Sequence, residues 1–311
     1  MSLSNHQKAV IALIIANVIW GAASPIFKWS LENVGTFTLA FLRFFIAAYI
    51  FLPFTYKNLF IKREHISKLI IASIFGITLN ISFFFIALSL TASINVPIIG
   101  STGPVILLIA SSIFLHEKLK PKVVNGLLLS LIGILVIIVI PVYKTGIDTS
   151  VMGNLLLIAA TISSVIHTIM MKKIVGFYDA RTITFWSFLI SSITFLPLML
   201  YETASIGFLP GLEMKGLIGI LFGTLLSSAA AYGLFQYAVK NMKASETGIF
   251  TYIDPFPAIL IAIPLLGERL TAEYIFGAIL VFLGIYIAEG RVHYHPLHLL
   301  KNVSNGLKSI I

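Results

Sequence analysis

Long runs of apolar residues alternate with short polar segments along the whole chain. Each run is about 20 residues long, the length that an α-helix needs to cross the hydrocarbon core of a bilayer. The pattern predicts an all-α integral membrane protein with ten transmembrane helices. The predicted spans are residues 9–28, 36–56, 67–90, 93–115, 123–142, 152–171, 182–201, 216–239, 244–266 and 272–289.

Two of these spans are interrupted near their centres. The ninth contains the stretch 251–257, in which Pro255 and Pro257 remove backbone donors beside a carboxylate. The fourth contains the stretch 100–104. Adding 151 to these residue numbers aligns them with the beginning of the stretch 251–257. Matched broken helices in two halves of a membrane protein indicate the binding site of a secondary transporter. We expect the helix breaks, or hinges, at Gly103, Pro104, Pro255 and Pro257.

The two breaks belong to a repeat that covers most of the chain. The same offset pairs other residues that rarely match by chance, and we interpret the paired glycines as helix-packing positions. Each half holds five spans, so the second half enters the membrane from the opposite face. The sequence therefore predicts two inverted five-helix repeats, residues 9–142 and 152–290. The pairs are Pro104 with Pro255, Glu117 with Glu268, Gly126 with Gly277, and Gly133 with Gly284.

Lysine and arginine are distributed unequally between the two sides of the predicted membrane. One set of alternate segments carries 16 of them and the opposite set carries 4, while Arg43 lies inside the second span. Cytoplasmic loops carry the excess of basic residues, so both termini are predicted to be cytoplasmic. The basic tail, residues 291–311, has apolar residues at helical spacing and is predicted to form an interfacial amphipathic helix.

Composition supports a membrane protein and excludes several other classes. Apolar residues make up 58% of the chain, charged residues 11%, and the mean hydropathy is +1.01. The net charge of +9 lies in short loops, so it indicates topology and not nucleic-acid binding. The chain has no cysteine, no phosphate-binding loop and no HExxH motif. We expect no enzyme activity, no cofactor and no metal site; His293, His295 and His298 are interpreted as polar tail residues.

Two charged residues lie deep within predicted spans. Asp254 either caps the half-helix that Pro255 begins or faces a water-filled cavity, where it binds a cationic group or a proton. Its counterpart in the other repeat is Gly103, so the charge is not required by the repeat. Arg43 is interpreted as a structural anchor, with Asp254, backbone carbonyls and an anionic substrate group as alternative partners. Glu268, at a span end, is interpreted as an interfacial anchor or cap.

Uncharged polar and aromatic residues inside the spans indicate the character of a cavity. A histidine side chain ordinarily titrates near neutral pH, so His167 joins Asp254 as a candidate for proton coupling, against the alternative of an interhelical hydrogen bond. Together, the polar and aromatic residues inside the spans suit a small neutral or zwitterionic solute with an apolar part. The candidate substrate-binding residues are Asn17, Trp20, Asn80, Phe84, Thr102, Ser164, His167, Tyr232, Gln236, Thr251, Tyr252 and Asp254.

In order and spacing, these motifs resemble the EamA family of the drug/metabolite transporter superfamily, as two tandem copies over residues 9–290. The second copy lacks the Trp-Gly and Arg-Phe pieces of the first. The resemblance implies ten helices, inverted five-helix repeats and a central cavity. The matching pieces are Trp20-Gly21 with Lys28, Arg43-Phe44, Ala87-Leu88 with Ala92, Pro104, Glu117-Lys118-Leu119, Gly126 and Gly133, then Ala238 with Ala244, Pro255, Glu268-Arg269-Leu270, Gly277 and Gly284.

Members of that family move amino acids, amines, sugars and other metabolites. The sequence and the resemblance together predict a gradient-driven transporter of a small organic metabolite in the cell membrane, working by alternating access. An amino acid or related compound is favoured as substrate, and export is favoured as direction. The alternatives are a lipid flippase or scramblase and, less favoured, a membrane-embedded enzyme. The expected partners are the substrate and the lipid bilayer, and both a monomer and a homodimer stay open.

Overall fold

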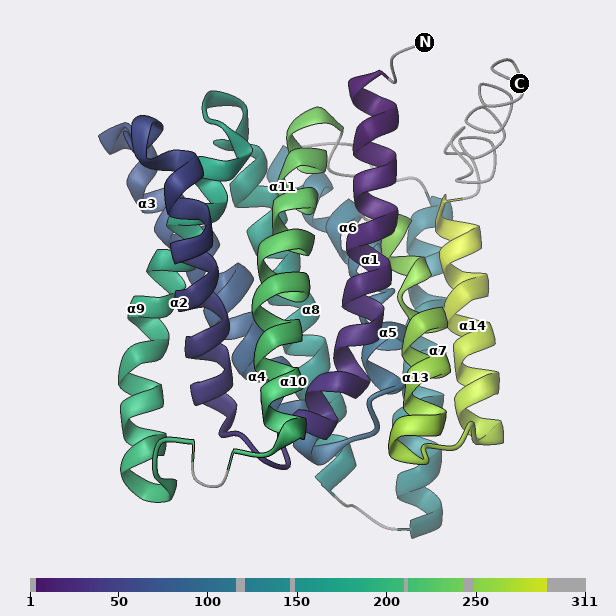
Figure 1. Cartoon of the computed structure of the whole chain (residues 1–311). Helices are drawn as coiled ribbons and strands as arrows, with labels where there is room; N and C mark the ends of the chain where they lie inside the picture. Colours follow the sequence, from purple (N-terminus) through teal and green to yellow (C-terminus); the bar gives the residue numbers. More distant parts are fainter. Residues whose placement is uncertain (1–3, 116–120, 146–148, 210–211, 243–248, 290–311) are drawn as a thin grey trace, which may run out of the picture.

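The structure is a computed structural model, and it describes residues 4–115, 121–145, 149–209, 212–242 and 249–289. Within these ranges the chain folds into helices joined by short connections (Figure 1). In this described part, six helices are long and apolar enough to cross a membrane. They are Asn5–Ser30 (α1), Thr36–Thr55 with Tyr56–Asn58 (α2 and η1), Arg63–Leu90 (α3, η2 and α4), Thr149–Lys172 (α8), Ala180–Ile206 (α9) and Met214–Asn241 (α10, η4 and α11).

Other apolar helices account for the remaining four predicted spans, two of which are broken near the middle. The fourth span consists of Asn95–Gly100 (α5) and Gly103–Leu115 (α6), and the ninth of Ile249–Ile253 (η5) and Pro255–Leu266 (α13). Pro121–Thr145 (α7) and Ala272–Glu289 (α14) are the fifth and tenth. The predicted all-α multi-pass fold is confirmed, and both interrupted spans are broken where the prolines indicated. The tail 291–311 lies outside the described residues.

The third and eighth spans contain a feature that the sequence analysis did not predict. Each is widened at its centre into a π-helical segment, Ile74–Leu79 (η2) in one half and Phe222–Ala230 (η4) in the other. The repeat offset places η2 on residues 225–230, within η4. A π turn shifts backbone carbonyls out of the α-helical ladder, and such segments often lie at functional sites.

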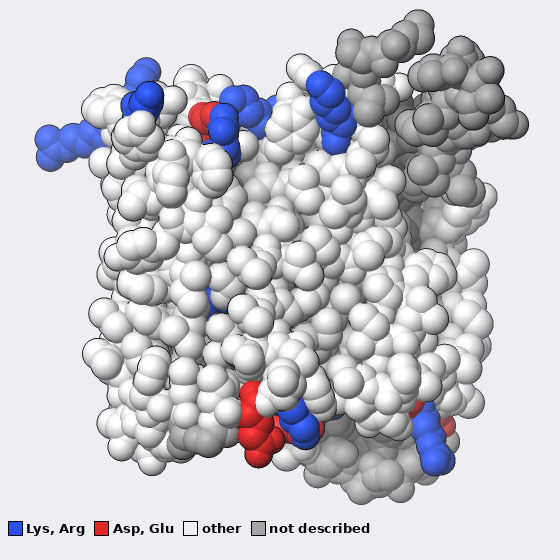
Figure 2. All heavy atoms as spheres, viewed as in Figure 1, with Lys and Arg blue, Asp and Glu red and all other residues white. Residues whose placement is uncertain are grey.

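The two halves run in opposite directions. The linker 91–94 between α4 and α5 receives Lys28 from the end of α1 and Asn154 from the beginning of α8. We call this side the distal face, and the side where α1 begins the N-terminal face. Charged side chains gather at these two ends of the molecule, with a broad uncharged band between them in the view of Figure 2. Which face is cytoplasmic stays a prediction.

Close glycine contacts join the last helices of the two halves, α7 and α14. A methyl group built on Gly133 would lie 2.6 Å from the carbonyl oxygen of Gly277, and one built on Gly277 would lie 2.7 Å from that of Gly133. Gly284 packs in the same way against Gly126. The glycines that match by sequence repeat therefore pair crosswise in space, as two antiparallel helices require.

We expect Gly133→Ala to lower the apparent melting temperature of the detergent-solubilised protein. The added methyl group meets backbone atoms that cannot rotate away, and overpacking of this kind costs about 1–3 kcal/mol. Gly176→Ala is the matched control, because a methyl group there meets no atom within 4 Å. Equal melting temperatures for the two variants would contradict the packing role of Gly133.

Candidate functional site

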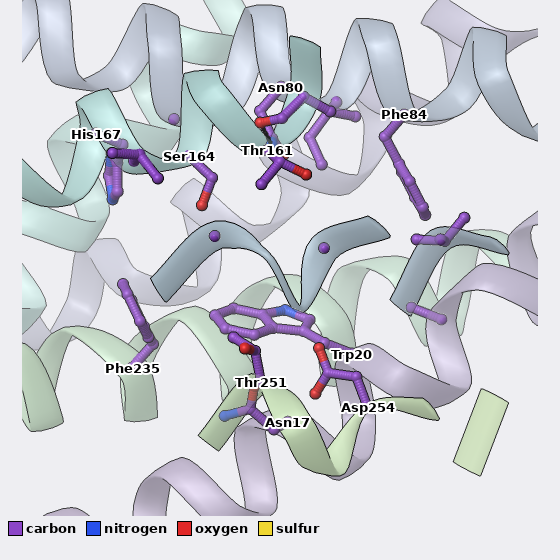
Figure 3. Close-up of a pocket in the computed structure, with 18 of the residues that line it drawn as sticks. Asn17, Trp20, Asn80, Phe84, Thr161, Ser164, His167, Phe235, Thr251 and Asp254 are labelled. Carbon is purple, nitrogen blue, oxygen red and sulfur yellow. Dashed lines mark hydrogen bonds between the residues drawn. The ribbon is translucent and has the colours of Figure 1, made fainter. Parts of the chain in front are cut away.

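A cavity of about 260 Å³ lies where the broken helices meet the first and third spans of both halves (Figure 3). It offers room for a solute of the size of an amino acid. Most candidate residues from the sequence line it, together with Arg43 and the break residues Gly103 and Pro104. Those candidates are Asn17, Trp20, Asn80, Phe84, Ser164, His167, Tyr232, Thr251 and Asp254.

Three candidate residues lie outside the lining. Thr102 is buried at the α5–α6 break, and its hydroxyl donates to the carbonyl of Ile99 at 2.7 Å. Tyr252 packs edge-on against Phe282 of α14. Gln236 is buried behind His167, with 3.5 Å between their Nε2 atoms.

The two prolines after Asp254 serve the backbone and do not line the cavity. Pro255 is the first residue of α13, where its missing N–H leaves no vacant hydrogen bond. Pro257 packs closely against Gly21 of α1. The structure thus places the break where the sequence analysis expected it, with α1 crossing α13 at this point.

Asp254 occupies the N-cap position of α13 without using its side chain as a cap. Its backbone is α-helical, with φ −55° and ψ −38°, and the carboxylate accepts no capping hydrogen bond. Oδ1 is buried and has no hydrogen-bond partner among the described residues. In Figure 3 the carboxylate lies beside Trp20, on the cavity wall formed by η5 and α1. The acid is therefore available to a bound group.

Two asparagines add oxygen acceptors to the cavity. Asn17 donates its amide to the carbonyl of Leu13 at 2.8 Å, and its buried Oδ1 has no partner in the described part of the chain. Asn80 donates across to the carbonyl of Ala160 in α8 at 2.7 Å. Each side-chain amide donates one bond to backbone, and each side-chain oxygen can accept from a ligand that donates hydrogen bonds.

Arg43 is held in an aromatic box at the edge of the cavity and is only 1% exposed. Its Nε donates to Ser228 Oγ at 2.9 Å, and its Nη2 donates to Ser227 Oγ at 3.0 Å. The guanidinium carbon lies 4.7 Å from the ring centre of Phe27 and 4.6 Å from that of Phe44. Two hydroxyl bonds and two ring faces stabilise the charge, which agrees with the interpretation of a structural anchor.

One nitrogen of the guanidinium nevertheless has no partner. Arg43 Nη1 is buried without a hydrogen-bond partner, and no ion pair joins Arg43 to a carboxylate among the described residues. Pairing with Asp254, one of the alternatives from the sequence, is therefore absent. The cavity region holds both a carboxylate oxygen and a guanidinium donor that nothing in the described chain satisfies.

His167 connects α8 to the π segment of the third span. Its Nδ1 lies 2.9 Å from the carbonyl oxygen of Ala72, and the ring packs directly on Gly76. A carbonyl only accepts, so Nδ1 donates to it, while Nε2 lies 3.5 Å from Nε2 of Gln236. This geometry matches the alternative of an interhelical hydrogen bond.

Backbone carbonyls in and beside the π segments bind two polar side chains around the cavity. Besides the bond from His167, Trp20 Nε1 donates to the carbonyl of Ser227 in η4 at 3.1 Å. Trp20 also packs against Tyr232 and Phe235, with both ring centres 5.3 Å away. Phe235 is a lining residue that the offset of 151 pairs with Phe84, so the repeat already contained the signal for it.

Other lining residues carried no such signal. Most of them are apolar or glycine, and in a membrane protein an apolar side chain serves equally well against lipid. This group includes Ala23, Phe27, Gly76, Val96, Leu107 and Leu157. Thr161, Thr168 and Ser227 are the polar exceptions.

Fold and cavity together define a multi-pass helical membrane protein with two inverted halves around a central solute-sized cavity. Two segments, residues 7–139 and 151–289, match the model of the EamA-like transporter family. The chain belongs to that family, and the predicted membership is confirmed.

Similar proteins agree with this membership. An uncharacterized transporter of Archaeoglobus fulgidus is 28% identical over 90% of this chain and 98% of its own length. A probable amino-acid metabolite efflux pump of Escherichia coli K12 is 25% identical over 91% of this chain and 95% of its own. A protein of known crystal structure shares the fold, with a TM-score of 0.66 and 16% identity over 92% of this chain and 98% of that one.

We expect Arg43→Lys to destabilise the protein although it keeps the positive charge. An ammonium group cannot reproduce the two directed bonds to Ser227 and Ser228 or stack on the rings. The lost charge-assisted bonds correspond to about 1.5–3 kcal/mol of unfolding free energy. Thermal unfolding followed by size-exclusion chromatography measures the effect, and an unchanged melting curve would contradict it.

Proposed function

We propose that this chain is a gradient-driven transporter of a small organic metabolite in the cell membrane, working by alternating access around the central cavity. The favoured substrate is an amino acid or a related compound, and the favoured direction is export. Membership of the EamA-like transporter family supports transport. Relatives named as probable amino-acid metabolite efflux pumps in Escherichia coli and Salmonella typhimurium support the substrate class and direction.

The observation that carries the proposal is the unsatisfied carboxylate oxygen of Asp254 in the cavity. An ionisable group without a partner at membrane depth is costly and is retained when it has a function. Asp254 and the free oxygen of Asn17 form an acceptor pair suited to an ammonium group. The free donor of Arg43 suits a carboxylate, so a zwitterion would satisfy both charges.

The other cavity residues would select the size of the solute and take part in proton coupling. Trp20, Phe84 and Phe235 offer ring surfaces for the apolar part of the solute. In the absence of solute, a proton on Asp254 would neutralise the carboxylate, which makes Asp254 the favoured coupling residue. His167 is the weaker coupling candidate, because both of its ring nitrogens lie near groups of the protein.

Reconstituted protein in liposomes tests the proposal. We expect exchange of at least one labelled amino acid or related metabolite between the lumen and the medium, because the cavity admits a solute of that size. A broad panel should include sugars, organic acids and a fluorescent phospholipid. No movement of any solute would contradict transport, and movement of the phospholipid alone would make the protein a flippase.

We expect Asp254→Asn to reduce flux by about tenfold or more, since a neutral amide cannot pair with a cationic group; loss of a charged partner costs about 1.5–3 kcal/mol. The protein should remain folded, because the carboxylate makes no capping bond. Asp179→Asn is the matched control: Asp179 caps α9 outside the cavity, and asparagine caps equally well. Wild-type flux and wild-type pH dependence in Asp254→Asn would exclude a role in binding or coupling.

A further inference from the structure

A compact polar cluster lies on the distal face, at the linker 91–94 between α4 and α5. Glu268, which follows α13 in the second half, accepts from the backbone N–H of Ser93 at 2.7 Å and from that of Ile94 at 3.1 Å. It also accepts from the hydroxyl of Ser93 at 3.0 Å. One carboxylate of the second half thus satisfies the start of a helix in the first half.

Lys28, at the end of α1, completes the cluster. Its ammonium group donates to the carbonyl of Thr91 at 2.7 Å and to Glu268 Oε1 at 3.1 Å. The backbone determines where each charge lies. The carbonyl at the end of α4 needs a donor, which is the lysine, and the N–H groups before α5 need an acceptor, which is the glutamate. We call Lys28, Glu268 and the linker 91–94 the distal clasp.

The clasp is better shielded than an ordinary surface ion pair. The Glu268 side chain is 10% exposed and the Lys28 side chain 30%, whereas Lys215 and Glu32 on the same face are 37% and 55% exposed. Exposed pairs contribute little because water screens them, while a shielded, multiply bonded carboxylate is costly to disconnect. Tyr274 of α14 adds a bond from its hydroxyl to the carbonyl of Ile94 at 3.1 Å.

The helices that meet at the clasp also reach the cavity. α1 carries Asn17 and Trp20 about two to three turns before Lys28, and α13 follows Asp254 and ends beside Glu268. α5 begins at the clasp and ends at Gly100, a lining residue. α1 and α13 touch at Gly21, whose position leaves no room for a methyl group against the Asp254 backbone. These helices therefore connect the cavity directly to the clasp.

We propose that the distal clasp is the gate of the distal face: its intact bonds hold the cavity shut there, and their release opens it. The inference rests on the proposed transport function. Lys28 and Glu268 are then positioning residues, which set the equilibrium between closed and open states without touching the solute. Solute or a proton at Asp254 biases that equilibrium through α13.

A related lysine contact exists on the N-terminal face. Lys172, at the end of α8, donates to the carbonyls of Val239 at 2.9 Å and Met242 at 2.6 Å. The repeat offset pairs Met242 with Thr91, so in both halves the first helix ends with a lysine bound to the end of the third. Glu117, the sequence counterpart of Glu268, lies outside the described residues. The gate proposed here is that of the distal face alone.

The absence of cysteine makes the gate measurable without prior mutagenesis of native thiols. Val96→Cys places one thiol in α5 on the cavity wall next to the clasp. A membrane-impermeant thiol reagent is added from the distal side of oriented proteoliposomes, and the labelling rate is measured. We expect Glu268→Gln or Lys28→Met to raise that rate by about tenfold, the effect of shifting the gate equilibrium by about 1.4 kcal/mol.

The Glu32→Gln variant is the matched control, because it breaks an exposed ion pair on the same face and should leave the rate unchanged. Wild-type labelling rates in both clasp variants, in protein that elutes as a folded peak, would overturn the gate. An equal rise in the control would overturn it too, since the whole face would then have loosened.

A milder variant tests the gate if Glu268→Gln and Lys28→Met do not fold. Tyr274→Phe removes only the hydroxyl bond to Ile94, and we expect a smaller rise in labelling; no rise would overturn the gate. Labelling does not depend on knowing the solute. If no solute moves in any assay while labelling responds to the clasp variants, the clasp still controls access from the distal face and the proposed transport function fails.

Discussion

A helix that is interrupted inside a bilayer leaves N–H and C=O groups that no water can satisfy, and this protein interrupts or widens four of its spans. Local backbone bonds serve the two breaks, and side chains from other helices bind backbone groups at the π segments and at the α4–α5 linker. His167 and Trp20 donate to carbonyls beside and within the π segments, and Lys28 and Glu268 satisfy the carbonyl and N–H groups around the α4–α5 linker. The polar residues buried in this apolar chain are therefore mostly bound to backbone.

A few buried side chains differ from these, because one of their polar atoms has no hydrogen-bond partner in the described chain. Arg43 and Asp254 are both charged residues at membrane depth. Arg43 binds two hydroxyls and lies against aromatic rings, so only its Nη1 is left without a partner, whereas Asp254 makes no capping bond and leaves Oδ1 without a partner in the described chain. A protein that finds partners for nearly every broken backbone group would have little reason to leave a carboxylate unpaired. The contrast explains why we assign the anchor role to Arg43 and the solute role to Asp254.

Residue chemistry allowed part of this arrangement to be predicted from the sequence. Proline cannot continue a helix, so the breaks at Pro104 and Pro255 could be placed, and polar residues such as Asn17 and Asn80 could be assigned to the interior. The π segments could not, because their widened turns depend on the side chains packed against them. Thr102 and Tyr252 contact Ile99 and Phe282 and do not line the cavity, which no local pattern encodes. Glu268 was interpreted as an interfacial anchor, and its partners became visible only when distant helices were brought together.

The glycine contacts between α7 and α14 have a consequence for biosynthesis. These helices are the last of their respective halves, so the carbonyl of Gly126 meets Gly284 only after the final span has been made. Until then, the first half presents to lipid a helix face shaped for a protein neighbour. The order of synthesis therefore determines when α7 and α14 can pack together. The first five spans enter the membrane with the glycine face of α7 uncovered, and insertion of the tenth span supplies the helix that covers it.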